Sequence, residues 1–123
     1  MQDESSIKIS VSTNPIPKAL APNDGRYYFE YHITITNIGD SWAKLLKRHW
    51  IIIDGDGNTE EVKGDGVVGY FPELSPGRSF TYTSYCPLDT TWGTMEGFYK
   101  FTRRDGSLFD VPIPRFVLHN DLE

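Results

Sequence analysis

The segment from Tyr27 to Asn37 alternates strictly between apolar and polar positions. One face carries the side chains of Tyr27, Phe29, Tyr31, Ile33 and Ile35. The other face carries those of Tyr28, Glu30, His32, Thr34 and Thr36. Because side chains on a pleated strand change face at every residue, this pattern predicts a half-buried β-strand. Asn37 and Gly39 are typical of a turn that ends it.

Weaker forms of the same pattern predict further strands. They are expected at residues 7–13, 45–54, 59–63, 79–85, 98–103, 107–111 and 113–118. Asp105-Gly106 is a strong hairpin signal, and the stretch from Gly55 to Asn58 has the composition of a second hairpin turn. Since proline cannot donate a ladder hydrogen bond, Pro112 and Pro114 indicate that the last strand begins at a sheet edge or a bulge.

No window of the sequence has a convincing helical period. Residues 40–47 are the one candidate, and they are short and uncapped. Short strands separated by turns, without helices to cover a parallel sheet, predict an all-β antiparallel sandwich or barrel. The 123 residues suit one domain, which we expect to span residues 1–123 with flexible ends at residues 1–6 and 119–123.

Charge and cysteine content narrow the function classes. The net charge of −5 argues against a general nucleic-acid binder, which needs a basic face to neutralise phosphates. No apolar run is long enough to span a bilayer, so no membrane insertion is expected. Cys86 is the one cysteine, which excludes an internal disulfide and favours a reducing, cytoplasmic compartment. The first residues lack the pattern of a signal peptide.

The segment Gly64-Asp65-Gly66-Val67-Val68-Gly69 has the spacing of a dinucleotide-binding fingerprint. That fingerprint requires a following helix, because the pyrophosphate sits on the helix N-terminus. Pro72 and Pro76 deny such a helix, so we interpret the glycines as allowing a bulge or a tight crossing. An alternative is that backbone N–H groups form an anion nest. Its candidate residues are Lys63, Gly64, Gly66, Gly69 and Arg78.

The acidic stretch from Asp54 to Glu60 resembles the opening of a calcium loop. Such a loop needs glycine at its sixth position and a bidentate glutamate at its twelfth. This chain has Thr59 and Asp65 at those positions, so an acidic hairpin tip is the better interpretation. No metal site is predicted, and Asp54 and Asp56 are weak candidates for a water-mediated cation.

No catalytic constellation is evident. The histidines, His32, His49 and His119, lack a metal-ligand partner at short spacing. Cys86 lies in no motif that offers a base, and we expect it to be buried. Turn and edge roles account for the carboxylates of Asp89, Glu96, Asp105 and Asp110. We therefore expect no enzyme activity and no cofactor.

Tryptophans are the candidates for an interaction surface. Trp42 and Trp92 are large enough to anchor a protein partner if they are exposed. Basic residues near the tryptophans, such as Lys47 and Arg48, are also found in single-stranded nucleic-acid binders. In an acidic chain we prefer tryptophans in a core or a protein interface, with no nucleic acid bound.

Several segments together resemble the ApaG domain family. They are YYFEYHITITN (27–37), LLKRHW (45–50), VKGDGVVGYFP (62–72), LSPG (74–77), FTYTS (80–84), GTMEG (93–97) and FDVPIPRFVL (109–118). The GDGVVG block, followed by a proline and an L-x-P-G turn, is the most specific of these. Tyr85 departs from the family pattern, which usually has a small residue there, and this departure bears on the local turn and on any pocket beside it.

The resemblance implies an immunoglobulin-like or fibronectin type III-like sandwich and no established enzymatic activity. It also implies a link to cobalt and magnesium efflux, which is indirect for a chain without a membrane segment. The leading hypothesis is a cytoplasmic, non-catalytic module that binds an unidentified protein partner, with weak homo-oligomers allowed. The alternative is a small-ligand sensor that binds pyrophosphate, a nucleotide or a divalent cation through the loop from Gly64 to Gly69. An enzyme using dispersed carboxylates is a remote third reading.

Overall fold

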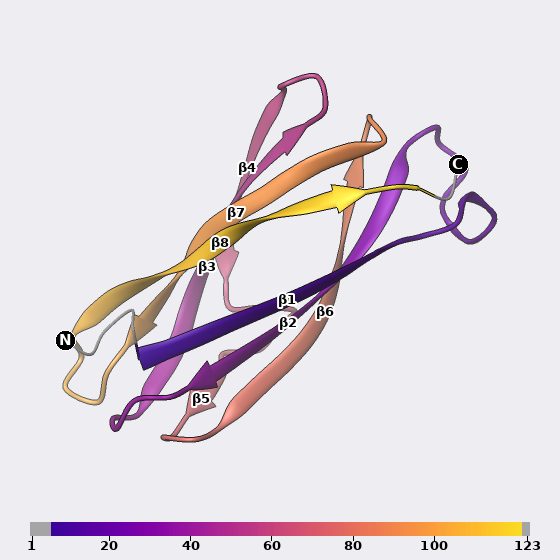
Figure 1. Ribbon diagram of the computed structural model, residues 1–123. Coiled ribbons are helices and arrows are strands. Elements are labelled where there is room, and N and C mark those ends of the chain that lie inside the picture. Colours follow the sequence, from indigo (N-terminus) through magenta and orange to yellow (C-terminus); the bar gives the residue numbers. More distant parts are fainter. Residues whose placement is uncertain (1–5, 122–123) are drawn as a thin grey trace.

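The structure, a computed structural model, describes residues 6–121 and consists of two antiparallel β-sheets packed face to face (Figure 1). The first sheet has the order β1-β2-β6, with β1 at Ile7–Pro15, β2 at Tyr27–Asn37 and β6 at Ser79–Leu88. The second has the order β4-β3-β7-β8, with β4 at Thr59–Asp65, β3 at Ala43–Asp54, β7 at Trp92–Thr102 and β8 at Leu108–His119. A short strand, β5 (Glu73–Leu74), also pairs with β3. The expected antiparallel sandwich is confirmed.

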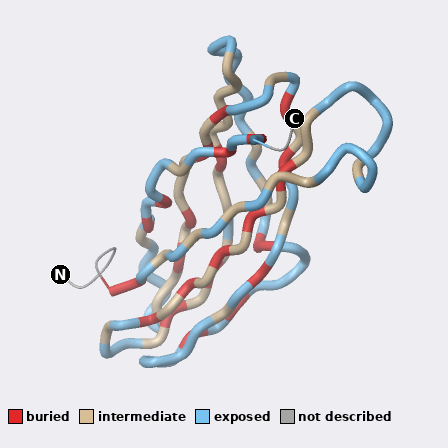
Figure 2. The backbone as a smooth tube through the Cα atoms, turned by 45° about the vertical axis from the view of Figure 1, so that its right-hand side comes forward, coloured by how far each residue is buried: buried red, intermediate tan, exposed pale blue. Residues whose placement is uncertain are grey.

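The core lies between the sheets because both sheets alternate buried and exposed positions. In β2, Phe29, Ile33 and Ile35 are fully buried, as the sequence pattern predicts. Tyr99 and Phe101 of β7 face them from the second sheet and are also fully buried. Figure 2 shows this alternation as short buried segments along the strands. The buried residues of both sheets form one hydrophobic cluster.

The edges of the two sheets differ. On one side of the sandwich β1 contacts β8, which brings two edge strands together. On the other side, β6 is the outer strand of the first sheet, opposite β4 and β5 of the second. Residues 66–72 connect β4 to β5 on this side. The glycine segment therefore borders the open side of the sandwich.

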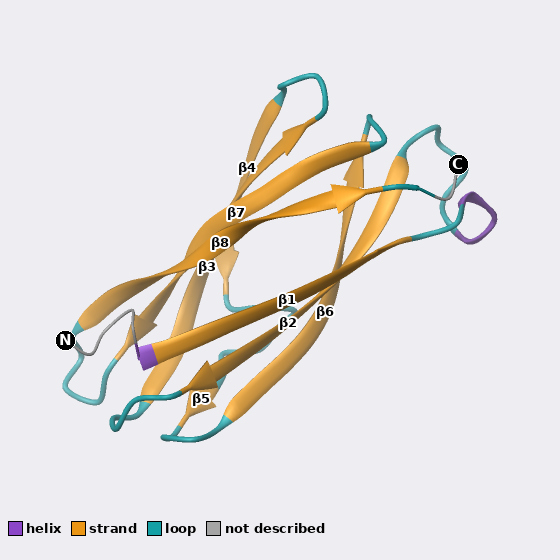
Figure 3. Cartoon of the chain, viewed as in Figure 1, coloured by secondary structure: helices purple, strands orange, loops and turns teal. Residues whose placement is uncertain are grey.

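The secondary structure differs from the expected one at two places. Most of residues 107–111 and all of residues 113–118 belong to one strand, β8. The strand includes Pro112 and Pro114, which are tolerated there because β8 is an edge strand. The register of its pairing with β7 shifts between Met95 and Gly97, which is the bulge that the prolines indicated. Residues 40–47, short and uncapped in sequence, form no helix, as expected, and most of them belong to β3. A 3-10 helix, η2 (Lys18–Leu20), was not expected (Figure 3).

The expected flexibility of the ends stays a prediction, and the described end residues pack against the fold. Ser6 is 5% exposed, and Asn120 is buried with its N–H bonded to the Thr91 carbonyl at 2.9 Å. His119 is the last residue of β8. Residues 1–5 and 122–123 of that expectation lie outside the described residues. Within the described chain no helix has the length and apolarity needed to cross a membrane.

Candidate functional site

The glycine segment forms a two-residue turn after β4. Val67 and Tyr70 exchange two backbone hydrogen bonds of 2.9 and 2.8 Å, and Val68 and Gly69 between them both have positive φ, at 43° and 85°. The N–H of Gly66 donates to the Leu46 carbonyl at 2.8 Å. The N–H groups of Gly66, Val67 and Tyr70 are thus used within the protein and are not available to an anion.

Arg48 holds this segment from inside the sandwich. Its Nη1 donates to the carbonyl oxygens of Asp65 at 3.0 Å and Gly66 at 2.9 Å. A Cβ on Gly64 would lie 2.6 Å from Nη2 of Arg48, so the guanidinium packs directly against the glycine backbone. The segment therefore presents carbonyl oxygens to a cation supplied by the protein itself.

Arg78 is separated from the other candidates for an anion site. It lies in the turn before β6, where its N–H bonds to the Ser75 carbonyl and its carbonyl accepts from Asn37. Lys63 and Gly64 instead line a groove on the outer face of the second sheet, and Arg78 does not line it. The predicted grouping of Arg78 with Lys63 is not found in this groove.

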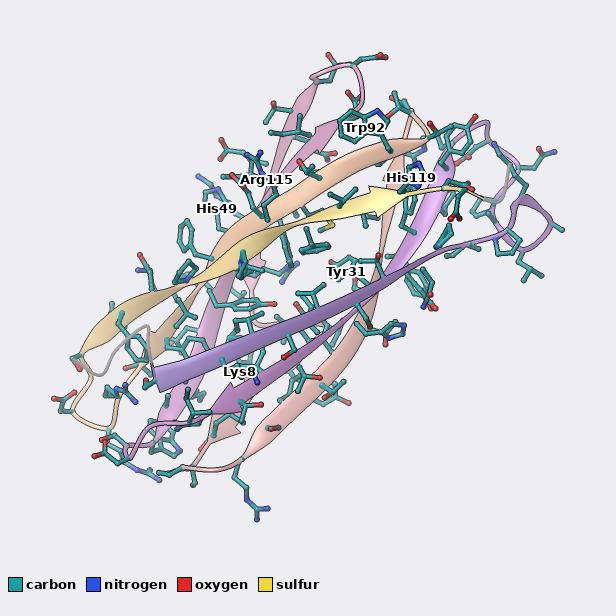
Figure 4. The ribbon with its side chains drawn as sticks, in the orientation of Figure 1. Lys8, Tyr31, His49, Trp92, Arg115 and His119 are labelled. Carbon is teal, nitrogen blue, oxygen red and sulfur yellow. The ribbon has the colours of Figure 1, made fainter. Side chains whose placement is uncertain are left out.

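This groove, which we call the basic groove, has a volume of about 390 Å³ and crosses β4, β3 and β7. Its lining residues are Lys47, Arg48, His49, Lys63, Gly64, Asp65, Phe98 and Lys100. The rings of His49 and Phe98 lie 4.8 Å apart and form an aromatic surface in the groove. Figure 4 shows His49 on the second sheet, away from Tyr31 between the two sheets. Cations and an aromatic surface are thus combined in one concave site.

Carboxylates already pair with most of the cations around the basic groove. Lys47 binds Asp65 at 2.9 Å, and Lys100 binds Asp110 at 2.8 Å. The hydrogen bond from Lys47 holds the pKa of the Asp65 carboxyl below its usual value. Among the described residues Lys63 has no ion-pair partner. Because exposed ion pairs contribute only about 0–1 kcal/mol, a multivalent anion can replace such carboxylates at low cost.

A second feature is the outer edge of β6. The N–H of Asn37 donates to the Arg78 carbonyl at 3.0 Å. Because bonded and non-bonded pairs alternate along an antiparallel ladder, the bonds from β6 to β2 fall on every second residue from there. Those residues are Phe80, Tyr82, Ser84 and Cys86. The backbone groups of Ser79, Thr81, Thr83 and Tyr85 point to the open side.

Within the part of the chain that the structure describes, the N–H groups of these four outward residues have no hydrogen-bond partner. Pro87 belongs to the same outward set, which agrees with its lack of an N–H. The strand spans ten residues and contains no charged side chain. It therefore presents a continuous row of unpaired donors and acceptors, which is a template for another strand.

The other edges carry features that discourage strand addition, such as charges and prolines. β4 contains Glu60, Glu61 and Lys63, and β8 contains prolines within the strand. β1 contains Lys8 and ends at a proline. β6 lacks such protection along most of its length, since its one proline is next to its last residue.

Exposed apolar side chains lie beside the first half of β6. Tyr70 is 61% exposed and Phe71 is 48% exposed. The ring of Tyr70 lies 5.8 Å from the ring of Phe80 on β6, which places the turn next to this edge. Exposed apolar surface next to an unpaired strand edge is typical of a protein-interaction site.

The two tryptophan candidates differ in exposure. The guanidinium of Arg104 stacks on Trp42 at 4.2 Å from the ring centroid, so Trp42 is partly covered. Trp92 is 45% exposed, with its indole against the backbone of Gly55. Trp92 is therefore the more accessible of the two.

The acidic hairpin and the carboxylates are occupied by local contacts. Asp54 accepts hydrogen bonds from the N–H groups of Asp56 and Asn58, both at 2.9 Å, so its carboxylate closes the turn. Glu96 pairs with Arg115 at 2.7 Å. Within residues 6–121 no group of three or more histidine, cysteine, aspartate or glutamate side chains is placed to hold a metal ion.

Sequence reasoning missed the edge of β6 and the grouping of Lys63 with Lys47 and Lys100. The absence of charge from residues 79–88 was a visible signal, since an edge strand without charge is unusual. The grouping of lysines had no local signal, because these residues lie on three different strands.

Comparison with known proteins gives concordant matches. A model of the ApaG domain matches residues 17–103. A protein named ApaG from Dechloromonas aromatica is 48% identical over 120 residues, which cover 96% of this chain and 94% of that protein. A protein of the same name from Acidovorax is 50% identical over 112 residues, covering 91% of this chain and 82% of that protein.

Solved structures match to a similar extent. The crystal structure of a putative ApaA protein from Bordetella pertussis is 43% identical to this chain, with a TM-score of 0.87. The match covers 95% of each chain.

Proposed function

The chain belongs to the ApaG domain family, and we propose that it acts as a non-catalytic module that binds an extended segment of a partner protein along the free edge of β6. The row of unpaired backbone groups on this uncharged strand carries the proposal. Hydrogen bonds to those groups give affinity, and neighbouring side chains give specificity. Tyr70 and Phe71 supply exposed apolar surface next to the edge.

A binding module of this kind needs no reactive group. Burial raises the pKa of the Cys86 thiol to about 12, which removes it as a nucleophile at neutral pH. The carboxylate of Asp54 closes a turn, and that of Glu96 pairs with Arg115. We further propose a cytoplasmic location and an indirect part in cobalt and magnesium efflux, through the partner that the module binds.

The proposal is tested by the substitution Thr83→Pro. It removes an outward N–H from β6 without removing a backbone hydrogen bond to β2. We expect proteins that co-purify with the native chain to be lost with Thr83→Pro and kept with Thr13→Pro, a matched change on β1, because the N–H of Thr13 also points away from β2. Hydrogen exchange of the complex should show new protection at Ser79, Thr81, Thr83 and Tyr85. Co-purified proteins that bind both variants equally would contradict strand addition at β6.

A second candidate function is the binding of a phosphate-bearing anion in the basic groove. Lys63, which has no ion-pair partner among the described residues, and the groove volume of about 390 Å³ support it. Pyrophosphate and ATP would bind through Lys63 and Lys100, whereas the backbone of Gly66 to Gly69 would take little part. The affinity for these anions would fall as the salt concentration rises, because the lysines are exposed to solvent and salt screens their charges.

Titration of the labelled protein with pyrophosphate, ATP, magnesium and cobalt, followed by NMR, tests this second function. We expect pyrophosphate to shift resonances of Lys63 and Lys100, and Lys63→Ala to weaken binding while Lys8→Ala, on the outer face of the first sheet, leaves it unchanged. No shift at millimolar pyrophosphate would exclude the basic groove as an anion site.

A further inference from the structure

A groove of about 630 Å³ lies on the outer face of the first sheet, away from the core. One wall is the loop that carries η2, which projects beyond the end of the sheet in Figure 3. The floor is formed by Tyr28 and Glu30 of β2 and by Tyr85 of β6. Tyr85 lies opposite Glu30 in the strand register, so the two tyrosines are diagonal neighbours across the pair of strands.

Apolar exposure in this groove is unusually high. Leu20 is 78% exposed and Tyr85 is 60% exposed, although both are large apolar or aromatic side chains. Neither contributes to the core cluster. A concave surface that joins such side chains is typical of a binding site, because covering them removes apolar area from water.

The groove is held in one shape by its own residues. The carboxylate of Asp24 accepts hydrogen bonds from the Arg26 N–H at 3.0 Å and from the Tyr28 hydroxyl. The N–H of Ile16 donates to the Tyr28 carbonyl at 2.8 Å. Prolines at positions 15, 17 and 22 restrict the wall, since each fixes its φ near −65°. A ligand therefore has little ordering of the loop to achieve, which favours binding.

Glu30 is the one charged side chain among the residues that line this groove. The imidazole of His32 lies beside it, with Nε2 at 3.4 Å from its carboxylate, and Nδ1 of the same ring bonds to Thr83. Arg26 does not neutralise Glu30, because Arg26 pairs with Asp24 at 3.5 Å. The groove thus combines tyrosine rings, prolines and one negative charge.

We propose that this groove binds an extended, proline-containing segment of a partner protein that carries a lysine or arginine. Proline rings pack against tyrosine rings, and a polyproline II segment is already extended, so it loses little entropy on binding. The cationic side chain of the segment meets the carboxylate of Glu30. Negative charge in the groove, together with the net charge of −5, disfavours acidic peptides and anionic lipid surfaces.

This site meets the β6 edge of the proposed function at Tyr85, and its other lining residues lie outside β6. Leu20 and Glu30 lie on the η2 loop and on β2, and neither belongs to β6. The backbone groups of β6 point along the sheet, whereas the side chain of Tyr85 points out of its face. Each surface is therefore testable without disturbing the other.

The test uses the full chain and a fluorescent peptide of the pattern Pro-x-x-Pro with one arginine. We expect saturable binding that shifts NMR resonances of Leu20, Tyr28 and Tyr85, and about tenfold weaker binding for Glu30→Gln, which loses the charged contact. Leu20→Ala should also weaken binding, and its exposure means that the fold is not at risk. Leu108→Ala, at another exposed apolar position, is the matched control and should bind normally.

A charge exchange makes the test stricter. A peptide with glutamate in place of arginine should fail to bind the native chain and should bind Glu30→Lys. Equal binding of both peptides by the native chain, or no shift at millimolar peptide, would overturn the proposal. Shifts of the same residues on concentrating the protein alone would also overturn it, since they identify a second copy as the occupant. Thr83→Pro should bind the peptide normally, which separates this result from the β6 edge.

Discussion

The guanidinium of Arg48 fills the space that a side chain at Gly64 would need. The distance from an ideal Cβ at Gly64 to Nη2 of Arg48 is 2.6 Å, too short for any real contact. The same guanidinium binds the carbonyls of Asp65 and Gly66, so one glycine and one arginine together fix the start of the turn. Contacts within the protein thus explain why a glycine stands at position 64.

The first prediction concerns this contact. Gly64→Ala should displace the guanidinium of Arg48 and weaken its two bonds to carbonyls, which lowers the free energy of unfolding by about 1 kcal/mol, because the mobile end of the arginine can move aside. Urea denaturation measures the change. In an Arg48→Ala background the same substitution should cost much less, because the clash is gone. Additive effects of the two substitutions would contradict the proposed contact.

The second prediction concerns Val68, which has a φ of 43° in a turn where both central residues have positive φ. Branched side chains are strained there, whereas asparagine followed by glycine is the preferred pair. Val68→Asn should therefore raise the free energy of unfolding by about 1 kcal/mol. Val67→Asn is the matched control and should destabilise the fold, since Val67 is fully buried. A loss of stability in Val68→Asn would show that the positive φ of Val68 does not strain the native chain.

The third prediction tests the direction of the backbone groups in β6. Thr83→Pro removes an outward N–H and the exposed bond from Thr83 to His32, so it should cost at most about 1 kcal/mol. Ser84→Pro removes a bond to β2 and should cost about 3 kcal/mol or more. Thermal or urea unfolding compares the two variants.

Hydrogen exchange of the free protein gives an independent check of that alternation. The amides of Thr81 and Thr83 should exchange fast, and those of Tyr82 and Ser84 should exchange slowly. Equal protection along β6 would mean that its outer edge is not free.

The fourth prediction concerns Cys86, which is 2% exposed. Burial raises the pKa of its thiol to about 12, against an ordinary value of 9.0. Above pH 9 the unfolded chain loses this proton while the folded chain keeps it, so the thiol contributes stability below pH 9 that is lost as pH rises toward 12. Between these two pKa values, ionisation of this thiol in the unfolded chain lowers the free energy of unfolding by about 1.4 kcal/mol per pH unit.

Urea denaturation between pH 7 and 10 measures the effect, and Cys86→Ala should lose stability less steeply with pH than the native chain. Iodoacetamide at pH 8.5 should label Cys86 slowly in the folded protein and fast in urea. Rapid labelling of the folded chain would show that the thiol is accessible.

Local patterns predicted the strands well where one face is buried. The alternation of Phe29 and Ile33 with polar neighbours sets which face of β2 joins the core, because the period of a strand is two residues wherever it lies. The burial of Cys86 and the hairpin closed by Asp54 follow from equally local chemistry. The prolines at 112 and 114 misled the prediction of separate strands, since their effect depends on which edge of the strand faces solvent.

The sequence by itself determined the strands, their faces and the turns, because these depend on neighbours within a few residues. Only the tertiary structure decided that Lys63 lies with Lys100 in one groove, that Tyr85 lies opposite Glu30, and that β6 has a free edge. These features depend on which strands are neighbours in a sheet. That order is set by pairing between residues far apart in the chain, and the period of one strand carries no information about its partner.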